Sequence, residues 1–305
     1  MKENLMPFKS KIGPQIRQKR EAKQLSREKL CHDGSRLTVR QLIRIEKGQS
    51  LPSLDKLDYI AQQLGLKPSD LLAEEELTIP DTYFELKHRL VKFPTYGDPE
   101  RVGQKQAMIE EAYEKYFTVL PEEELLFLDL SEKILNWSQT KKLVAIEEIY
   151  EDAFEQLQEK KIYNLNDLMV LGYYLIGIQQ QKYYDKKLFN KLKNRLLEQE
   201  PSTDELYNID LLSILISVLG VYVQHGDYGA TLPVFKKVYQ LIEETQQPSY
   251  RPSVMMVEAK YYLNVEGDKE QAGQLYDQAI NFATLLGDQV LADGLREEKD
   301  RDNLA

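Results

Sequence analysis

The chain has 305 residues, a length that allows two domains. Its net charge is −10, with 50 Asp and Glu against 40 Lys and Arg. Its single cysteine, Cys31, excludes an intrachain disulfide framework, and this cysteine and the three histidines show no metal-ligand spacing. The cysteine usage implies a cytoplasmic protein. The longest apolar run, at 211–223, has 13 residues and contains Ser213 and Ser217, which argues against a membrane span.

The first predicted elements are short capped helices. Helical spacing of apolar residues indicates a helix over 12–23. Ser26 is expected to cap a helix over 27–31, because its hydroxyl can accept from a backbone N–H that has no partner within the helix. After a turn that contains glycine, Thr38 is expected to cap a second helix over 39–47.

Two capped helices joined by such a turn form a helix-turn-helix, whose second helix places its N-terminal side chains on base edges in the major groove. Val39, Arg40 and Gln41 are therefore the predicted base readers. The full set of predicted DNA contacts is Arg27, Thr38, Val39, Arg40, Gln41 and Arg44. The alternative is that these side chains form an ordinary solvated face.

Two further helices, at 53–64 and 68–72, would complete a compact five-helix domain. The stretch IEKGQSLPSLDKLDYIAQQLGLKPSDLL, at 45–72, resembles the Cro/repressor type (XRE) of helix-turn-helix domain. This resemblance implies a structural ion pair between Arg20 and Glu46. It also implies that Cys31 occupies a position where a small apolar residue is usually buried, so this thiol is expected to pack rather than react.

Charge is divided unevenly along the chain. Residues 1–72 contain 15 Lys and Arg against 8 Asp and Glu, a net charge of +7, and the remainder of the chain carries −17. The basic part suits the phosphates of double-stranded DNA, and the acidic part would attract the basic part. We expect a DNA-binding domain over 1–72 and a short linker over 73–80, AEEELTIP.

The rest of the chain predicts antiparallel helix pairs. Gly-Asp steps recur between helices at 226–227, 267–268 and 287–288, where the glycine can end one helix and the aspartate can cap the next. The expected fold is all-α, in which about five degenerate tetratricopeptide-like pairs over 81–287 form a right-handed α-solenoid that ends in a C-terminal helix. The expected helices cover 82–91, 98–117, 121–137, 140–160, 164–180, 185–199, 203–225, 227–245, 252–266, 268–286 and 288–299.

No catalytic motif stands out. The sequence has no Gly-rich phosphate loop, no G-x-S-x-G and no H-E-x-x-H, so we expect neither an enzyme nor a cofactor. The 19 tyrosines, several of them in pairs, are consistent with core packing or with the lining of a groove for a short hydrophobic ligand.

The chain as a whole resembles the Rgg group of peptide-responsive regulators, and within it the competence regulators. The resemblance rests on LTVRQLIRIEKG (37–48), LVKFPTYGDPERV (90–102), LPEEELL (120–126) and EEIYEDAFEQ (147–156). It implies a receptor that binds a short hydrophobic signalling peptide in its groove and activates competence genes. It also implies a monomer when free, and a homodimer on a palindromic operator when activated.

The same resemblance suggests peptide-binding residues. Lys105 is the candidate for the peptide's terminal carboxylate, Asn208 the candidate for its backbone amides, and Arg251 a further candidate at the mouth of the groove. A surface lysine without this role is the alternative for Lys105. Segment 288–305 is implied to exchange between subunits, whereas its charged sequence alone favours an ordinary frayed terminus.

Opposite charges suggest how the free protein is kept from DNA. Glu122, Glu123 and Glu124 begin a predicted helix and are expected to contact Arg40 and Arg44 as an inhibitory surface. The alternative is that these glutamates only stabilise the positive end of their helix dipole. A competing function is a repressor or antitoxin-like scaffold whose helical array binds a protein partner.

Overall fold

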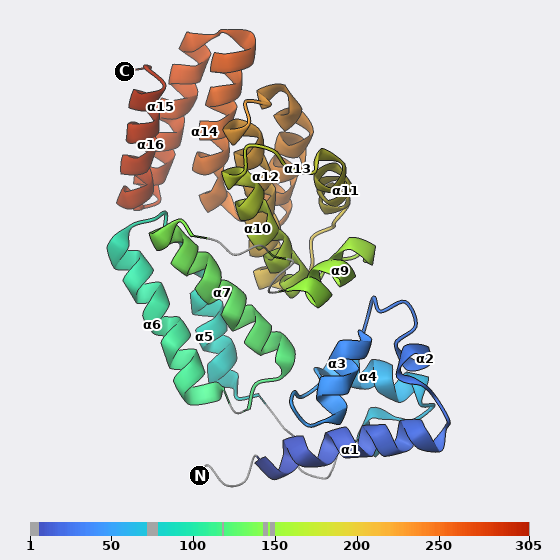
Figure 1. Cartoon of the computed structure of the whole chain (residues 1–305). Coiled ribbons are helices and arrows are strands. Elements are labelled where there is room, and N and C mark those ends of the chain that lie inside the picture. The colour runs from blue at the N-terminus through green and yellow to red at the C-terminus, as the bar shows by residue number, and fades with distance from the viewer. Residues whose placement is uncertain (1–5, 72–78, 118, 143–145, 147–149, 305) are drawn as a thin grey trace.

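The computed structural model describes residues 6–71, 79–117, 119–142, 146 and 150–304 (Figure 1). The structure is 75% helical, and no strand occurs among these residues, which confirms the predicted all-α fold. A small N-terminal domain, blue in Figure 1, lies beside a longer array of paired helices that runs from teal to red.

The N-terminal domain packs around a small apolar core that includes Ile16, Leu42, Ile45 and Ile60, all with no exposed surface. Cys31 is buried in the same core, and burial raises the pKa of its thiol to about 12. The domain contains α1 (Met6–Ala22), α2 (Arg27–Cys31), α3 (Val39–Glu46), α4 (Leu54–Gln63) and the 3₁₀ turn η1 (Pro68–Asp70).

Side-chain caps define these helices locally. Ser26 accepts from Lys29 N at 3.1 Å, and Ser53 accepts from Lys56 N at 3.2 Å. Of the element predicted at 68–72, residues 68–70 form a single 3₁₀ turn, in which Asp70 accepts from Lys67 N at 2.9 Å and which the buried Leu71 follows. Residue 72 lies outside the described residues.

Most of the array is built on one continuous core that extends from Tyr83 to Val257, and its last helices add two smaller apolar clusters. Its first helices are α5 (Asp81–Lys92), α6 (Pro99–Tyr116), α7 (Glu122–Thr140), α9 (Glu151–Glu159) and α10 (Leu165–Gln180). They are followed by α11 (Lys186–Leu197), α12 (Glu205–Gln224), the 3₁₀ turn η2 (Tyr228–Thr231) and α13 (Leu232–Glu244). The last elements are the 3₁₀ turn η3 (Pro248–Tyr250), α14 (Arg251–Tyr261), the π-helical turn η4 (Tyr262–Glu266), α15 (Lys269–Leu285) and α16 (Gln289–Arg301).

One predicted helix, at 140–160, differs from the structure. Thr140 belongs to the end of α7, which Lys141 terminates in the left-handed conformation with φ of 55°, and the next long helix, α9, begins at Glu151. Part of the predicted segment, 143–145 and 147–149, lies outside the described residues.

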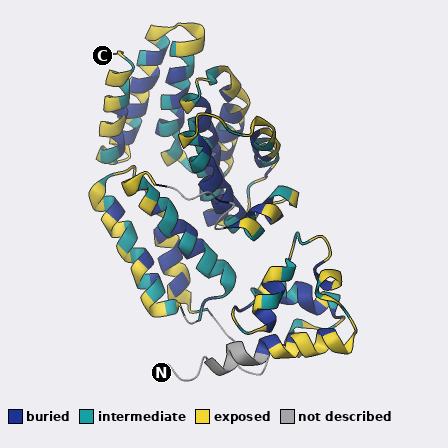
Figure 2. Ribbon diagram, in the orientation of Figure 1, coloured by how far each residue is buried: buried dark blue, intermediate teal, exposed yellow. Residues whose placement is uncertain are grey.

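Helix α12 is long and apolar enough to cross a membrane by composition, with a mean hydropathy of 1.9. However, 61% of its most apolar window is buried, and it packs against α5, α10, α13 and α14. Figure 2 shows this central helix as mostly dark blue, which marks buried residues. Its composition therefore fits a core helix.

The C-terminal helix α16 is docked on the array at both ends. Leu291, Ala292 and Leu295 are buried in its contact with the end of the array. Near the chain end, Asp302 accepts from Lys260 Nζ at 2.8 Å and from the Tyr276 hydroxyl at 2.6 Å. Because Lys260 and Tyr276 are buried, their hydrogen bonds to Asp302 do not fit the alternative of an ordinary frayed terminus.

Candidate DNA-binding interface and peptide cavity

The recognition helix α3 begins with a reciprocal capping box. Thr38 Oγ1 accepts from Gln41 N at 3.1 Å, and Gln41 Oε1 accepts from Thr38 N at 3.1 Å. Gln41 is therefore only 8% exposed and supports its own helix, whereas the side chain of Arg40 is 68% exposed and that of Arg44 51%. Of these predicted contacts, Arg40 and Arg44 are the outward-facing cations.

The other end of α3 carries a buried ionic cluster. Glu46 Oε1 accepts from Arg20 Nε at 2.6 Å, and Glu46 Oε2 accepts from Arg27 Nε at 2.8 Å. The hydrogen bond to Glu46 raises the pKa of Arg20. Arg27, predicted as a DNA contact, thus shares the structural carboxylate of Glu46, and its side chain is 32% exposed.

Two of the three predicted inhibitory glutamates contact the N-terminal domain. Arg44 Nη1 donates to Glu122 Oε1 at 3.0 Å, and Lys56 Nζ lies 3.0 Å from Glu123 Oε1. The backbone supports the same contact, since Glu122 N donates to Leu51 O at 3.3 Å. The first turn of α7 therefore lies against the recognition helix and the segment that follows it.

The third glutamate requires a correction. Glu124 accepts from Lys87 Nζ at 2.9 and 2.8 Å and from the Tyr83 hydroxyl at 2.6 Å, and both donors lie on α5 within the array. Successive side chains on an α-helix point about 100° apart, so a run of three cannot share one face. Glu124 holds the array together and makes no contact with the recognition helix.

Helix α9 supplies contacts that the sequence did not indicate. Arg40 lies 3.6 Å from Glu151 and 3.8 Å from Asp152, both in the first turn of this helix. Gln156 Nε2 donates to Gly34 O at 2.9 Å and to Gln41 Oε1 at 3.1 Å. The start of α3 thus meets α9 and its last turn meets α7, and the helix cannot enter a major groove while these contacts persist.

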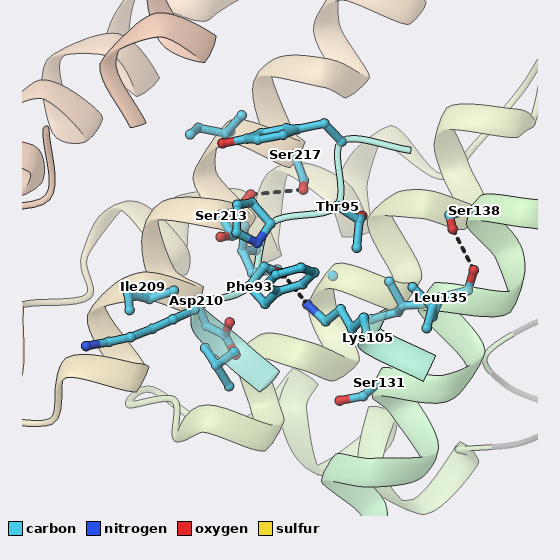
Figure 3. Close-up of a pocket in the computed structure, with 18 of the residues that line it drawn as sticks. Phe93, Thr95, Lys105, Ser131, Leu135, Ser138, Ile209, Asp210, Ser213 and Ser217 are labelled. Atoms are coloured by element: carbon cyan, nitrogen blue, oxygen red, sulfur yellow. Dashed lines mark hydrogen bonds between the residues drawn. The ribbon is translucent and has the colours of Figure 1, made fainter. Parts of the chain in front are cut away.

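The array contains a cavity of about 920 Å³, which is large enough for a short peptide segment. Its wall is formed by the end of α5 and the loop after it, by side chains of α6, α7, α10 and α12, and by residues of η3, α14 and Asp288. Apolar residues such as Phe93, Leu135 and Ile209 alternate with Ser131, Ser138, Ser213 and Ser217 (Figure 3).

Lys105 is the predicted peptide contact that lies in the cavity. Its amine donates to Phe93 O at 3.1 Å, and burial lowers its pKa. The other two candidates do not line the cavity. The amide of Asn208 bonds the backbone of Ser202 at 2.8 Å in both directions, and Arg251 pairs with Glu243, so both side chains serve local structure.

Helix α7 connects the two sites. Its first turn holds the N-terminal domain through Glu122 and Glu123, and its later turns contribute Phe127, Ser131 and Leu135 to the cavity wall. A ligand that changes the position of this helix would act on both sites.

Comparison with known proteins assigns the family. A sequence profile of the ComR tetratricopeptide domain matches residues 80–299, and a helix-turn-helix profile matches residues 16–71. The chain belongs to the ComR family. A search among curated proteins found no match.

Solved ComR structures also indicate whether the structure of this chain corresponds to the free or to the peptide-bound form. The apo form of the competence regulator ComR from Streptococcus vestibularis is 49% identical and has a TM-score of 0.86, over 98% of this chain and 100% of that chain. ComR from S. thermophilus in complex with DNA and its signalling peptide ComS is 48% identical, with a TM-score of 0.73 over 96% and 99%.

The S. vestibularis ComR in complex with its cognate signalling peptide XIP is again 49% identical, but its TM-score is 0.72, over 97% and 100%. Because identity and coverage are nearly equal, the lower scores reflect a different arrangement of the same helices. The structure of this ComR-family chain therefore resembles the apo form.

Proposed function

We propose that the chain is a cytoplasmic peptide receptor and transcription activator of competence genes, which acts by binding and has no catalytic step. Residues 1–72 serve as the DNA-binding domain, 73–80 as the linker, 81–287 as the peptide-binding array and 288–305 as the segment that exchanges on dimerisation. The observation that carries the proposal is α7, which contacts the recognition helix at one end and lines the cavity further along.

Weak contacts make the inhibition reversible. The Arg44–Glu122 pair joins side chains that are 51% and 17% exposed, and the Arg40 pairs are longer and more exposed. Exposed pairs of this kind contribute roughly 0.2–1 kcal/mol each. A few kcal/mol then separates the closed from the open state, which a peptide can supply by binding the open state about a hundredfold to a thousandfold more tightly.

Peptide recognition fits the chemistry of the cavity. Lys105 is the proposed partner of the terminal carboxylate, since its amine has one described acceptor, the carbonyl of Phe93. The apolar wall suits hydrophobic side chains, and the hydroxyls of Ser131, Ser213 and Ser217 can bond backbone amides. Two released subunits would then bind a palindromic operator through Arg40 and Arg44.

The direct test combines size-exclusion chromatography with a gel shift, using XIP of the S. vestibularis relative as the probe. We expect a monomer that binds operator DNA weakly without peptide, and a dimer that prefers operator to random DNA with peptide. Both DNAs must be compared at one salt concentration, because phosphate contacts make affinity strongly salt-dependent. Operator binding that is equally strong with and without bound peptide would contradict the proposal.

A further inference from the structure

Most charges around the peptide cavity are already balanced within the chain. Lys92 lies 2.7 Å from Glu205, and Asp288 lies 2.9 Å from Arg101. The ammonium group of Lys141 lies over the Trp137 ring, 4.6 Å from its centre, in a cation–π contact. A ligand is not needed to satisfy these groups.

Two charges in the cavity wall differ from the others. Lys105 donates to a neutral carbonyl, that of Phe93, and forms no described ion pair. Asp210 is on α12, and within the part of the chain that the structure describes its Oδ2 is buried without a hydrogen-bond partner. Figure 3 shows the Lys105 amine directed toward the side of the cavity where Asp210 and Ser213 lie.

Burial raises the pKa of Asp210 to about 7, against the opposing effect of Lys105 and Lys87. Asp204 adds to the rise. The other charged or titratable groups in the wall are Lys92, Tyr96, Lys141, Glu205, Tyr250 and Asp288. Of these, the four charged side chains have the partners given above, and the Tyr250 hydroxyl bonds the hydroxyl of Ser213 at 3.2 Å.

An incoming carboxylate would upset this balance. Lys105 would then face two negative charges, the carboxylate of Asp210 and that of the ligand, at a place where both the lysine amine and Asp210 Oδ2 are buried. A nearby like charge disfavours the ionised form of a carboxyl group, as does low dielectric. The change with the lowest free-energy cost is for Asp210 to take a proton from solvent and become a neutral acid, which also gains an O–H donor.

We propose that docking of the peptide's terminal carboxylate at Lys105 is coupled to uptake of one proton by Asp210. This inference rests on the proposed function and adds a chemical requirement to it. Asp210 acts as a residue that distinguishes a free carboxyl end, whose charge brings in the proton, from an amidated end, which brings none.

Isothermal titration calorimetry tests the coupling. XIP is prepared as the free acid and as the C-terminal amide, and each is titrated in phosphate and in Tris at the same pH, because the difference in binding heat counts the protons exchanged with the buffer. Above pH 8, where Asp210 is ionised in the free protein, the acid should bring in close to one proton and lose roughly tenfold in affinity per pH unit, whereas near pH 7 the uptake should fall to about half a proton. The amide should bring in none.

Two variants sharpen the result. Asp210→Asn keeps the size of the side chain but cannot titrate, so it should bind the acid without proton uptake and with a flat pH profile. Glu114→Gln, which removes an exposed carboxylate on α6, should behave as the parent. A thermal melt of each variant checks that the fold is retained, and the acid-amide comparison on the unchanged protein stands without them.

The outcomes separate the two proposals. Tight binding of the acid with no proton uptake by the parent, or with equal uptake by Asp210→Asn, overturns the inference and leaves the peptide receptor standing. If neither the acid nor the amide of XIP binds at any pH, the proposed function and the inference are both contradicted.

Discussion

Glu122 offers the clearest perturbation of the closed state. Its carboxylate accepts from Arg44 at 3.0 Å, with Arg44 51% and Glu122 17% exposed. Such a pair contributes roughly 0.2–1 kcal/mol. In Glu122→Lys the pair is lost, and the new lysine faces Arg44, with Lys56 on the same surface. Repulsion between these cations adds a destabilisation similar in size to the lost pair. The closed state should lose about 0.4–2 kcal/mol, which shifts the ratio of closed to open protein roughly two- to thirtyfold.

Fluorescence anisotropy with labelled operator DNA measures this shift without peptide. Glu122→Lys should bind operator in the absence of peptide and reach half activation at a lower peptide concentration. The added positive charge also strengthens nonspecific binding, so operator and random DNA are compared at fixed salt. Glu114→Lys, an exposed site on α6 outside the interface, makes the same change in net charge and serves as the control.

Two results would refute this reasoning. One is a Glu122→Lys protein that depends on peptide as strongly as the parent. The other is a Glu114→Lys protein that gains as much operator binding, because the effect would then come from net charge and not from the contact with Arg44.

Three further predictions follow from individual contacts. Arg40→Ala should keep its thermal stability but lose about 1–3 kcal/mol of preference for operator over random DNA, and an unchanged preference in a competition gel shift would exclude Arg40 as a base reader. Gln156→Ala removes the hydrogen bonds to Gly34 and Gln41 without changing charge, and because each bond contributes about 0.5–1.5 kcal/mol, operator binding without peptide should rise several-fold. No rise would mean that these bonds do not hold the closed state. Asp302→Ala removes the acceptor shared by Lys260 and Tyr276, so hydrogen exchange in α16 should accelerate by at least tenfold, given about 1.5–3 kcal/mol for bonds to charged groups. Unchanged protection would mean that the apolar contacts and the remaining ion pairs of α16 hold the helix without Asp302.

Local sequence determined the helices of the DNA-binding domain and the class of the protein. Ser26 and Thr38 cap where they were expected to, because a cap needs only a hydroxyl within three residues of a free backbone N–H. The all-α fold followed from apolar spacing, and the attraction between the two parts followed from charge counting, which needs no coordinates. The family resemblance to peptide-responsive competence regulators was likewise carried by short contiguous motifs.

Tertiary structure decided which side chains meet. Glu122, Glu123 and Glu124 are equivalent in sequence, but the rotation of the helix turns Glu124 toward Lys87 and leaves Glu122 facing Arg44. Gln156 reaches Gln41 across 115 positions of the chain, and no local pattern encodes such a pair. The sequence predicted a peptide groove and Lys105 in it, but the rest of the lining combines separate helices and excludes the candidates Asn208 and Arg251. Backbone hydrogen bonds and caps act over a few residues, whereas these contacts depend on how whole helices pack.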